Sequence, residues 1–198
     1  MTKLAVICYS ATGHGTTMAQ HIADAGERAG AEVRVRHIAE TNPTSFAHNP
    51  AWTGNYNATK DAPAASGDDI LWADAVIFGS PTRFGCPAAQ FRGFIDSLGG
   101  LWSQGKLADK VYAGFTSSQT PHGDQETTLL SLYISLMHFG GIIVPPGYTD
   151  PLKFVDGNPY GAGLIADHDN IGEFDEATND ALDHLARRVV TITDRFTS

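Results

Sequence analysis

Glycines and hydroxyl side chains fill the stretch YSATGHGTTM, residues 9–18, which follows the apolar run of residues 4–8. A short apolar run is typical of a buried strand, and Met18 and Ile22 then begin a pattern with helical spacing. Backbone N–H groups in a loop that opens a helix point toward a common centre and bind anions there. Residues 10–15, which we call the glycine loop, are therefore predicted to hold an anion.

The glycine loop contains no lysine or arginine, so neutral donors would have to hold that anion. Backbone amides would be assisted by the hydroxyls of Ser10, Thr12, Thr16 and Thr17. The dinucleotide fingerprint GxGxxG is not met, because Met18 stands in place of its third glycine, and no Gly-Lys-Ser/Thr follows as in a P-loop. The loop therefore favours a terminal monophosphate over a pyrophosphate. A helix-capping turn without a ligand is the alternative.

Two more polar loops follow predicted strands. Residues 81–85, PTRFG, follow the apolar run ADAVIFGS and are called the arginine loop, and residues 117–120, SSQT, follow KVYAGFT and are called the serine loop. The carboxyl ends of parallel strands meet at one edge of a sheet, so a ligand with its phosphate in the glycine loop would place a ring against these loops. Arg83 would then be a charge partner for an electron-rich ring; a solvated surface cation is the alternative.

His138 ends the predicted helix that follows the serine loop, just before Gly140 and Gly141. A ring nitrogen at this position could hydrogen-bond a substrate oxygen or accept a proton. A helix C-cap or a hydrogen-bonded core histidine is the alternative interpretation. The residue types thus leave the role of His138 open.

Strands and helices alternate along the chain, which predicts an α/β protein with an open, largely parallel sheet and helices on both faces. Five strands are expected in a single domain of residues 1–198. Two stretches break the alternation and are rich in Pro, Gly, Asn or Asp. We call them the first insertion, about residues 41–69, and the second insertion, about residues 145–172, and predict both as long loops.

The composition of the chain argues against several classes of binding partner. A net charge of -9, with 13 Lys and Arg against 22 Asp and Glu, argues against nucleic-acid binding, which needs a basic face. No run approaches the roughly 18 apolar residues of a membrane span. Two cysteines, Cys8 and Cys86, suit a reducing cytoplasm. The eight histidines show no HExxH or Cys/His spacing, so no metal site is expected.

Several stretches together resemble WrbA-type NAD(P)H:quinone oxidoreductases of the flavodoxin-like superfamily. They are YSATGHGTTMA, FGSPTRFG, GGLW, QETT, GNPYGA and HFGGIIVP, and they span nearly the whole chain. The resemblance implies a flavodoxin-like five-stranded sheet of order 2-1-3-4-5, FMN as cofactor, NADH or NADPH as electron donor and a quinone as acceptor. It also implies a cytoplasmic homotetramer or homodimer.

The resemblance further implies roles for individual residues. Arg83 and His138 would be catalytic, and Thr12, Trp102 and His138 would bind substrate, with Trp102 reaching the site of a neighbouring subunit. The FMN-binding residues would be Ser10, Ala11, Thr12, Gly13, His14, Gly15, Pro81, Thr82, Arg83, Phe84, Gly85, Ser117, Ser118, Gln119, Thr120 and His138.

This sequence departs from the family pattern at Thr12, where an aromatic residue is expected, and at Gly15, where a bulkier side chain is usual. The choice between NADH and NADPH therefore stays open. Three other functions also remain: a flavodoxin-type electron carrier, which an acidic chain suits; a non-catalytic FMN-binding regulatory module; and an NADP-binding dehydrogenase in which Arg34 or Arg36 meets a 2′-phosphate.

Overall fold

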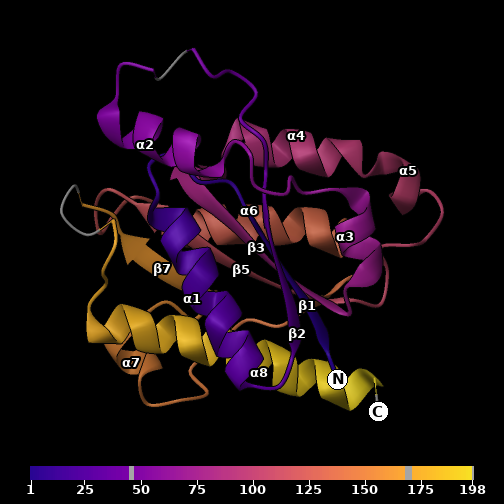
Figure 1. The fold of residues 1–198 in the computed structure, drawn as a ribbon. Coiled ribbons are helices and arrows are strands. Elements are labelled where there is room, and N and C mark those ends of the chain that lie inside the picture. Colours follow the sequence, from indigo (N-terminus) through magenta and orange to yellow (C-terminus); the bar gives the residue numbers. More distant parts are fainter. Residues whose placement is uncertain (45–46, 168–170, 198) are drawn as a thin grey trace.

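A parallel β-sheet with helices on both faces dominates the computed structural model, which describes residues 1–44, 47–167 and 171–197 (Figure 1). The neighbouring strands follow the order β2, β1, β3, β5, β6. Their bounds are β1 Lys3–Cys8, β2 Glu32–His37, β3 Ala75–Arg83, β5 Val111–Ser118 and β6 Ile142–Ile143. This is the predicted open parallel sheet, and its central strands coincide with the apolar runs of the sequence.

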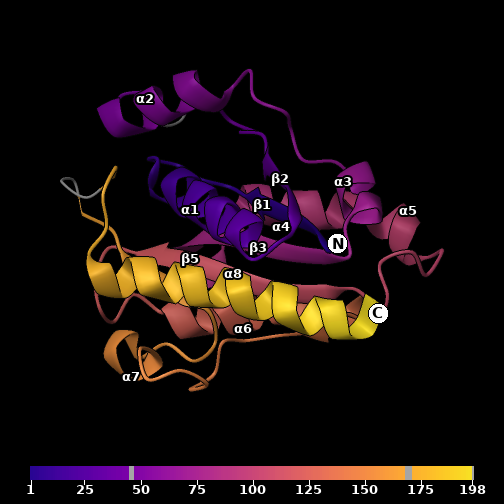
Figure 2. The same ribbon diagram turned by 60° about the horizontal axis from the view of Figure 1, so that its bottom comes forward.

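Alternation of side chains along the strands builds a separate core on each face of the sheet. Leu4 and Val6 of β1 pack in one core, whereas Ala5 and Ile7 pack in the other. The first core is covered by α1 (His14–Arg28) and α8 (Glu176–Thr197), as Figure 2 shows. The second is covered by α3 (Gly67–Trp72), α4 (Ala89–Ser97) and α6 (Gln125–His138). Burial on both faces explains why the central strands are apolar throughout.

The prediction of five strands is wrong, because the described residues form a sheet of seven strands. Strand β4 (Cys86–Pro87) forms a hairpin with β3, and β7 (Ala162–Ile165) pairs with the second half of β5. The position beside β5 is thereby shared by two strands, since β6 pairs only with the first two residues of β5. Pro145 and Pro146 follow directly after Val144, and proline has no N–H to continue a ladder.

The two insertions are also more ordered than the predicted loops. The first contains α2 (Pro50–Thr59) and the start of α3, and the second contains α7 (Lys153–Asp156) and β7. Their residues 45–46 and 168–170 lie outside the described residues. Helix α2 begins at a good capping site: Asn49 accepts a hydrogen bond from the backbone N–H of Trp52 at 3.1 Å, and Pro50 occupies the first turn. The remaining helix, α5, is Gly99–Trp102.

Candidate functional site

The three predicted loops lie together at the carboxyl ends of β1, β3 and β5. The backbone N–H of Tyr9 donates to the carbonyl of Gly79 at 3.0 Å, which joins the start of the glycine loop to β3. Pro81 is in register with Ser117, which places the arginine and serine loops on adjacent strands. Ligands of open α/β sheets bind at this edge, so the predicted grouping of the loops is correct.

The glycine loop presents an open helix N-terminus. Gly13 is the N-cap of α1, with φ 108° and ψ −30°, and no side-chain hydrogen bond caps the helix within the described residues. The first turn of α1 also contains no acidic residue. A helix end of this kind can bind an anion through backbone N–H groups, and the helix dipole favours negative charge there.

Two of the predicted hydroxyl donors are used elsewhere. The Thr16 hydroxyl donates to Oδ1 of Asn55 at 2.9 Å, and the Thr17 hydroxyl donates to the carbonyl of Ile171 at 2.7 Å. We therefore correct the expectation that Thr16 and Thr17 assist the amides. Ser10 behaves differently, because its Oγ accepts from the N–H of Gly13 at 3.2 Å and its own proton can still be donated.

His14 ties the glycine loop to the second insertion. Its Nε2 lies 2.8 Å from the carbonyl oxygen of Asp167, and its Nδ1 lies 3.1 Å from the hydroxyl of Thr12. A carbonyl only accepts, so Nε2 carries a proton, and in the neutral ring Nδ1 then accepts from Thr12. The side chains of Thr12 and His14 thus brace the loop, and its backbone N–H groups are the candidate donors for an anion.

Glu40, which the sequence analysis missed, joins four segments beside the glycine loop. Its carboxylate accepts hydrogen bonds from the hydroxyl of Tyr9 at 2.6 Å, Nε2 of Gln90 at 2.7 Å, the N–H of Asn42 at 3.0 Å and Nε1 of Trp52 at 3.4 Å. Partial burial acts to raise the pKa of Glu40, but these hydrogen bonds outweigh it and leave the pKa below its ordinary value. The carboxylate is therefore charged above acidic pH.

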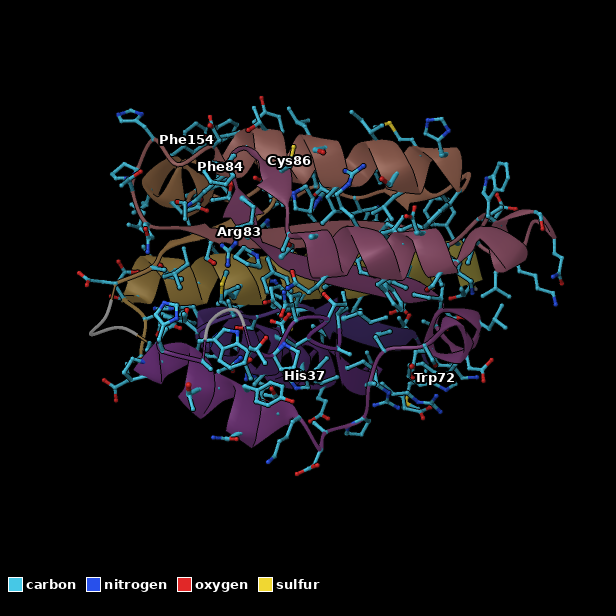
Figure 3. All side chains as sticks on the ribbon, turned by 90° about the horizontal axis from the view of Figure 1, so that it is seen from above. His37, Trp72, Arg83, Phe84, Cys86 and Phe154 are labelled. Atoms are coloured by element: carbon cyan, nitrogen blue, oxygen red, sulfur yellow. The ribbon has the colours of Figure 1, made fainter. Side chains whose placement is uncertain are left out.

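The arginine loop is the turn of a β-hairpin. Thr82 pairs with Pro87 and Arg83 with Cys86, which leaves Phe84 and Gly85 as the two turn residues. Their φ values, 55° and 79°, are both positive, as a type I′ turn requires. This turn leaves the Phe84 side chain fully exposed at the tip (Figure 3). The hairpin thus presents a flat aromatic ring at the sheet edge.

Arg83 and Thr82 supply a cation and a hydroxyl at the same edge. The Arg83 side chain is exposed, and it donates to the carbonyl of Thr82 at 2.9 Å. Burial raises the pKa of the Tyr9 hydroxyl, and the positive charge of Arg83 opposes that rise. The Arg83 charge is therefore felt at Tyr9, the residue between β1 and the glycine loop. Thr128 of α6, which sequence reasoning missed, donates to the Thr82 hydroxyl at 2.8 Å and fixes its position.

The serine loop contains both buried and exposed residues. Ser117 and Ser118 are buried, whereas Gln119 and Thr120 are exposed. The Ser118 hydroxyl accepts from Nε2 of Gln125 at 2.8 Å and donates to the carbonyl of Thr120 at 2.9 Å. Ser118 therefore shapes the turn of this loop, and Gln119 and Thr120 are the side chains that it presents outward.

His138 and Trp102 lie together, but away from the three loops. Nε1 of Trp102 donates to the carbonyl of His138 at 2.9 Å. Asp109, just before β5, donates its N–H to Gly140, which places this end of α6 at the amino ends of the strands. Helix α6 has 14 residues, so His138 lies roughly 20 Å from the edge where the loops meet. Within one chain, neither His138 nor Trp102 lines that edge.

The arginines proposed for a 2′-phosphate are already engaged. Nε of Arg36 lies 2.8 Å from Oδ1 of Asp69, and the Arg34 guanidinium lies 3.9 Å from the ring centre of Trp72. A phosphate bound to Arg36 would also lie close to the Asp69 carboxylate, and the two negative charges would repel each other. These contacts therefore argue against the NADP-binding dehydrogenase alternative.

The described residues contain neither a metal-binding cluster nor a membrane-spanning helix. No group of three or more His, Cys, Asp and Glu side chains there could hold a metal ion. None of the helices in the described part of the chain combines the length and the apolar character needed to cross a membrane.

The comparisons with known proteins agree on one family. The family model described as NADPH-dependent FMN reductase matches residues 2–150. A protein of Deinococcus radiodurans named NAD(P)H dehydrogenase (quinone) is 49% identical over 196 residues, which is 98% of this chain and 96% of that protein. A protein of the same name from Sinorhizobium fredii is 38% identical and covers 98% of this chain and 100% of its own length.

Solved structures share the fold. The flavodoxin, WrbA-like protein from Agrobacterium tumefaciens superimposes with a TM-score of 0.71 at 24% identity, covering 98% of this chain and 99% of that one. A flavodoxin from the domain Archaea gives 0.62 at 15% identity, covering 96% and 99%. At these identities the likeness establishes a flavodoxin-like fold and nothing finer.

Proposed function

This chain belongs to the NADPH-dependent FMN reductase family, and we infer that it is an FMN-dependent oxidoreductase that transfers two electrons from NAD(P)H to quinones. The relatives named NAD(P)H dehydrogenase (quinone) support both the donor and the acceptor. The resemblance to WrbA-type oxidoreductases found in the sequence is thereby confirmed. NADH and NADPH are not distinguished by these names.

The observation that carries this proposal is the uncapped N-terminus of α1 at the edge where the three loops meet. Backbone amides of a glycine loop at a helix N-terminus and the hydroxyl of Ser10 fit a monophosphate dianion, so this donor set suits the phosphate of FMN. When bound, FMN supplies the redox chemistry, taking two electrons from a reduced nicotinamide and returning them to a quinone. The protein supplies binding, orientation and charge.

Each loop then has a proposed part. Ser10, Ala11, Thr12, Gly13, His14 and Gly15 would hold the phosphate. Pro81, Thr82, Arg83, Phe84 and Gly85 would lie against one part of the flavin ring, and Ser117, Ser118, Gln119 and Thr120 would approach another edge. Thr82 offers a hydroxyl positioned by Thr128, and Arg83 offers a positive charge.

Arg83→Ala is expected to make the midpoint potential of bound FMN more negative. Reduction adds negative charge to the flavin, and a cation nearby stabilises that charge, by about 1 kcal/mol at 4 Å in water-like surroundings. A redox-dye titration of the variant measures the shift. Arg92→Ala, which removes an exposed cation from α4, serves as the matched control and should leave the potential unchanged. An Arg83→Ala protein with the wild-type potential would contradict the role of Arg83.

We propose that His138 and Trp102 act on substrate in the site of another copy, within a homotetramer or homodimer. Their distance from the loops of their own chain and the exposure of Trp102, at 53%, support this arrangement. His138 would hydrogen-bond a quinone oxygen and assist its protonation. Because the glycine loop is far from His138, this role does not involve phosphate binding.

His138→Ala is expected to lower turnover by roughly a hundredfold, within the range typical of general acid catalysis, and to leave FMN affinity unchanged. Steady-state kinetics and flavin titration measure the two effects, with His48→Ala, an exposed histidine of the first insertion, as the control. Mixing Arg83→Ala and His138→Ala proteins tests the sharing of sites, because mixed oligomers would contain some sites with both residues. If His138→Ala keeps the wild-type kinetics, the catalytic role of His138 is wrong and only its structural role at the end of α6 remains.

The proposed activity predicts a yellow protein that NADH or NADPH bleaches and a quinone turns yellow again. An electron carrier of the flavodoxin type would bind FMN but resist bleaching by either dinucleotide. A regulatory module would bind FMN without turnover.

We also propose a cytoplasmic location, which the free thiols of Cys8 and Cys86 suit. Burial raises the pKa of Cys8 to about 12, so this thiol stays protonated.

A further inference from the structure

We propose that Asn55 of α2 is a positioning residue that sets the glycine loop for the phosphate of FMN, an inference that rests on the proposed function. Asn55 belongs to the first insertion, far from the glycine loop in sequence. Its side chain bridges Ser10, the first residue of that loop, and Thr16, the residue just after it, and it makes no other side-chain hydrogen bond within the described residues.

The bridge uses both halves of the amide. Nδ2 of Asn55 donates to the carbonyl of Ser10 at 2.8 Å, and Oδ1 accepts from the hydroxyl of Thr16 at 2.9 Å. Ser10 begins the loop, whereas Thr16 lies in the first turn of α1. One side chain therefore closes residues 10–16 into a ring and fixes the separation of its ends.

The contact with Ser10 also orients a donor. In a trans peptide, the carbonyl of one residue and the N–H of the next point in opposite directions. Because the Ser10 carbonyl points at Asn55, the N–H of Ala11 points away from α2 and toward the opposite side of the loop. Asn55 thus holds one amide of the loop in a set direction without touching the anion itself.

Helix α2 is held in place by contacts that do not involve the Asn55 side chain. Trp52 is 4% exposed and donates to Glu40, which lies outside the helix, so this side chain attaches α2 to the rest of the protein. Within α2, Trp52 also stacks on Tyr56 at 4.9 Å between ring centres, and Asn49 caps the helix. Truncating Asn55 should therefore leave α2 where it is and release only the glycine loop, which makes a clean experiment possible.

The test compares FMN with riboflavin, which has the same ring but no phosphate. Apoprotein is titrated with each flavin, and binding is followed by quenching of flavin fluorescence. Asn55→Ala is expected to weaken FMN binding about tenfold, the effect of losing one well-placed hydrogen bond, and to leave riboflavin binding unchanged. Asn57→Ala, an exposed asparagine on the same helix, is the matched control and should change neither.

A second variant guards against misfolding of the first. Thr16→Val removes the other half of the bridge and should also weaken FMN selectively, while circular dichroism confirms that both variants are folded. Equal loss of FMN and riboflavin would show a general structural role and overturn the inference, as would unchanged FMN affinity in Asn55→Ala. If the wild-type protein itself binds no FMN, the proposed function fails, and this outcome is recognised before any variant is made.

Discussion

Replacing Gly13 with alanine is expected to weaken FMN binding by about a hundredfold, which corresponds to about 2.7 kcal/mol. Gly13 has φ 108°, a conformation that side chains rarely adopt, and a Cβ built on it would lie 2.8 Å from Cγ2 of Ile171. Strain of this kind costs about 1–3 kcal/mol, and the chain can relieve it only by rotating the peptides around residue 13. Those peptides contain the amides proposed to bind phosphate.

Gly30 offers a matched control at the other end of α1. It has φ 94°, yet a Cβ there would meet no atom within 4 Å, and it is far from the loops. Gly30→Ala should therefore lower the thermal stability through the same kind of strain and leave FMN affinity intact. Fluorescence titration and thermal melts of both variants separate the effects. If Gly13→Ala binds FMN as tightly as Gly30→Ala, the glycine loop is not the phosphate site.

The main elements of the fold could be predicted because each of them shows a strong pattern in the sequence. Strands β1, β3 and β5 are buried on both faces, so their apolar runs are continuous, and α4 shows its buried face in the spacing of Phe91 and Phe94. Strand β7 has only four residues, two of them Ala and Gly, so no pattern distinguished it from the loop around it. The sequence analysis therefore missed β7 as a second strand beside β5.

Helix α2 was missed for a different reason. The first insertion contains no Val, Ile or Leu between Thr41 and Asp69, so no helical periodicity could show. A single aromatic residue, Trp52, supplies most of the burial of α2 instead. The pair Asn49 and Pro50 was the one available signal, since Asn before Pro is a common helix start.

The residue types were enough to predict where the loops lie, but not which partners their side chains contact. The position of the glycine loop follows from the strand before it and the helix after it, which are local features. The partners of Thr16 and Thr17 are Asn55 and Ile171, which lie in the two insertions and are distant in sequence. Glu40 looks like any surface carboxylate until the fold brings four donors to it. Such choices depend on tertiary contacts that no local pattern encodes.

Gly79→Ala is expected to destabilise the protein by about 3 kcal/mol, the upper part of the usual range for overpacking a core. Gly79 lies in β3 beside Phe115 of β5, whose side chain is 1% exposed. A Cβ on Gly79 would lie 2.0 Å from Cζ and 2.4 Å from Cε2 of that ring. The ring is enclosed by the core, so either it or the strands must move. For a chain of this size the melting temperature should fall by roughly 6–12 °C.

Gly93→Ala is the control for Gly79→Ala, because a Cβ on this α4 residue would meet nothing within 4 Å. Alanine favours a helix over glycine by about 0.5–1 kcal/mol, so this variant should melt slightly higher than wild type. A smaller residue at position 115 should make room for the new methyl group. Phe115→Leu combined with Gly79→Ala should therefore lose less stability than the sum of the single changes in urea unfolding. Additive losses would mean that the ring does not oppose the methyl group, and that the bare backbone at Gly79 is needed for another reason.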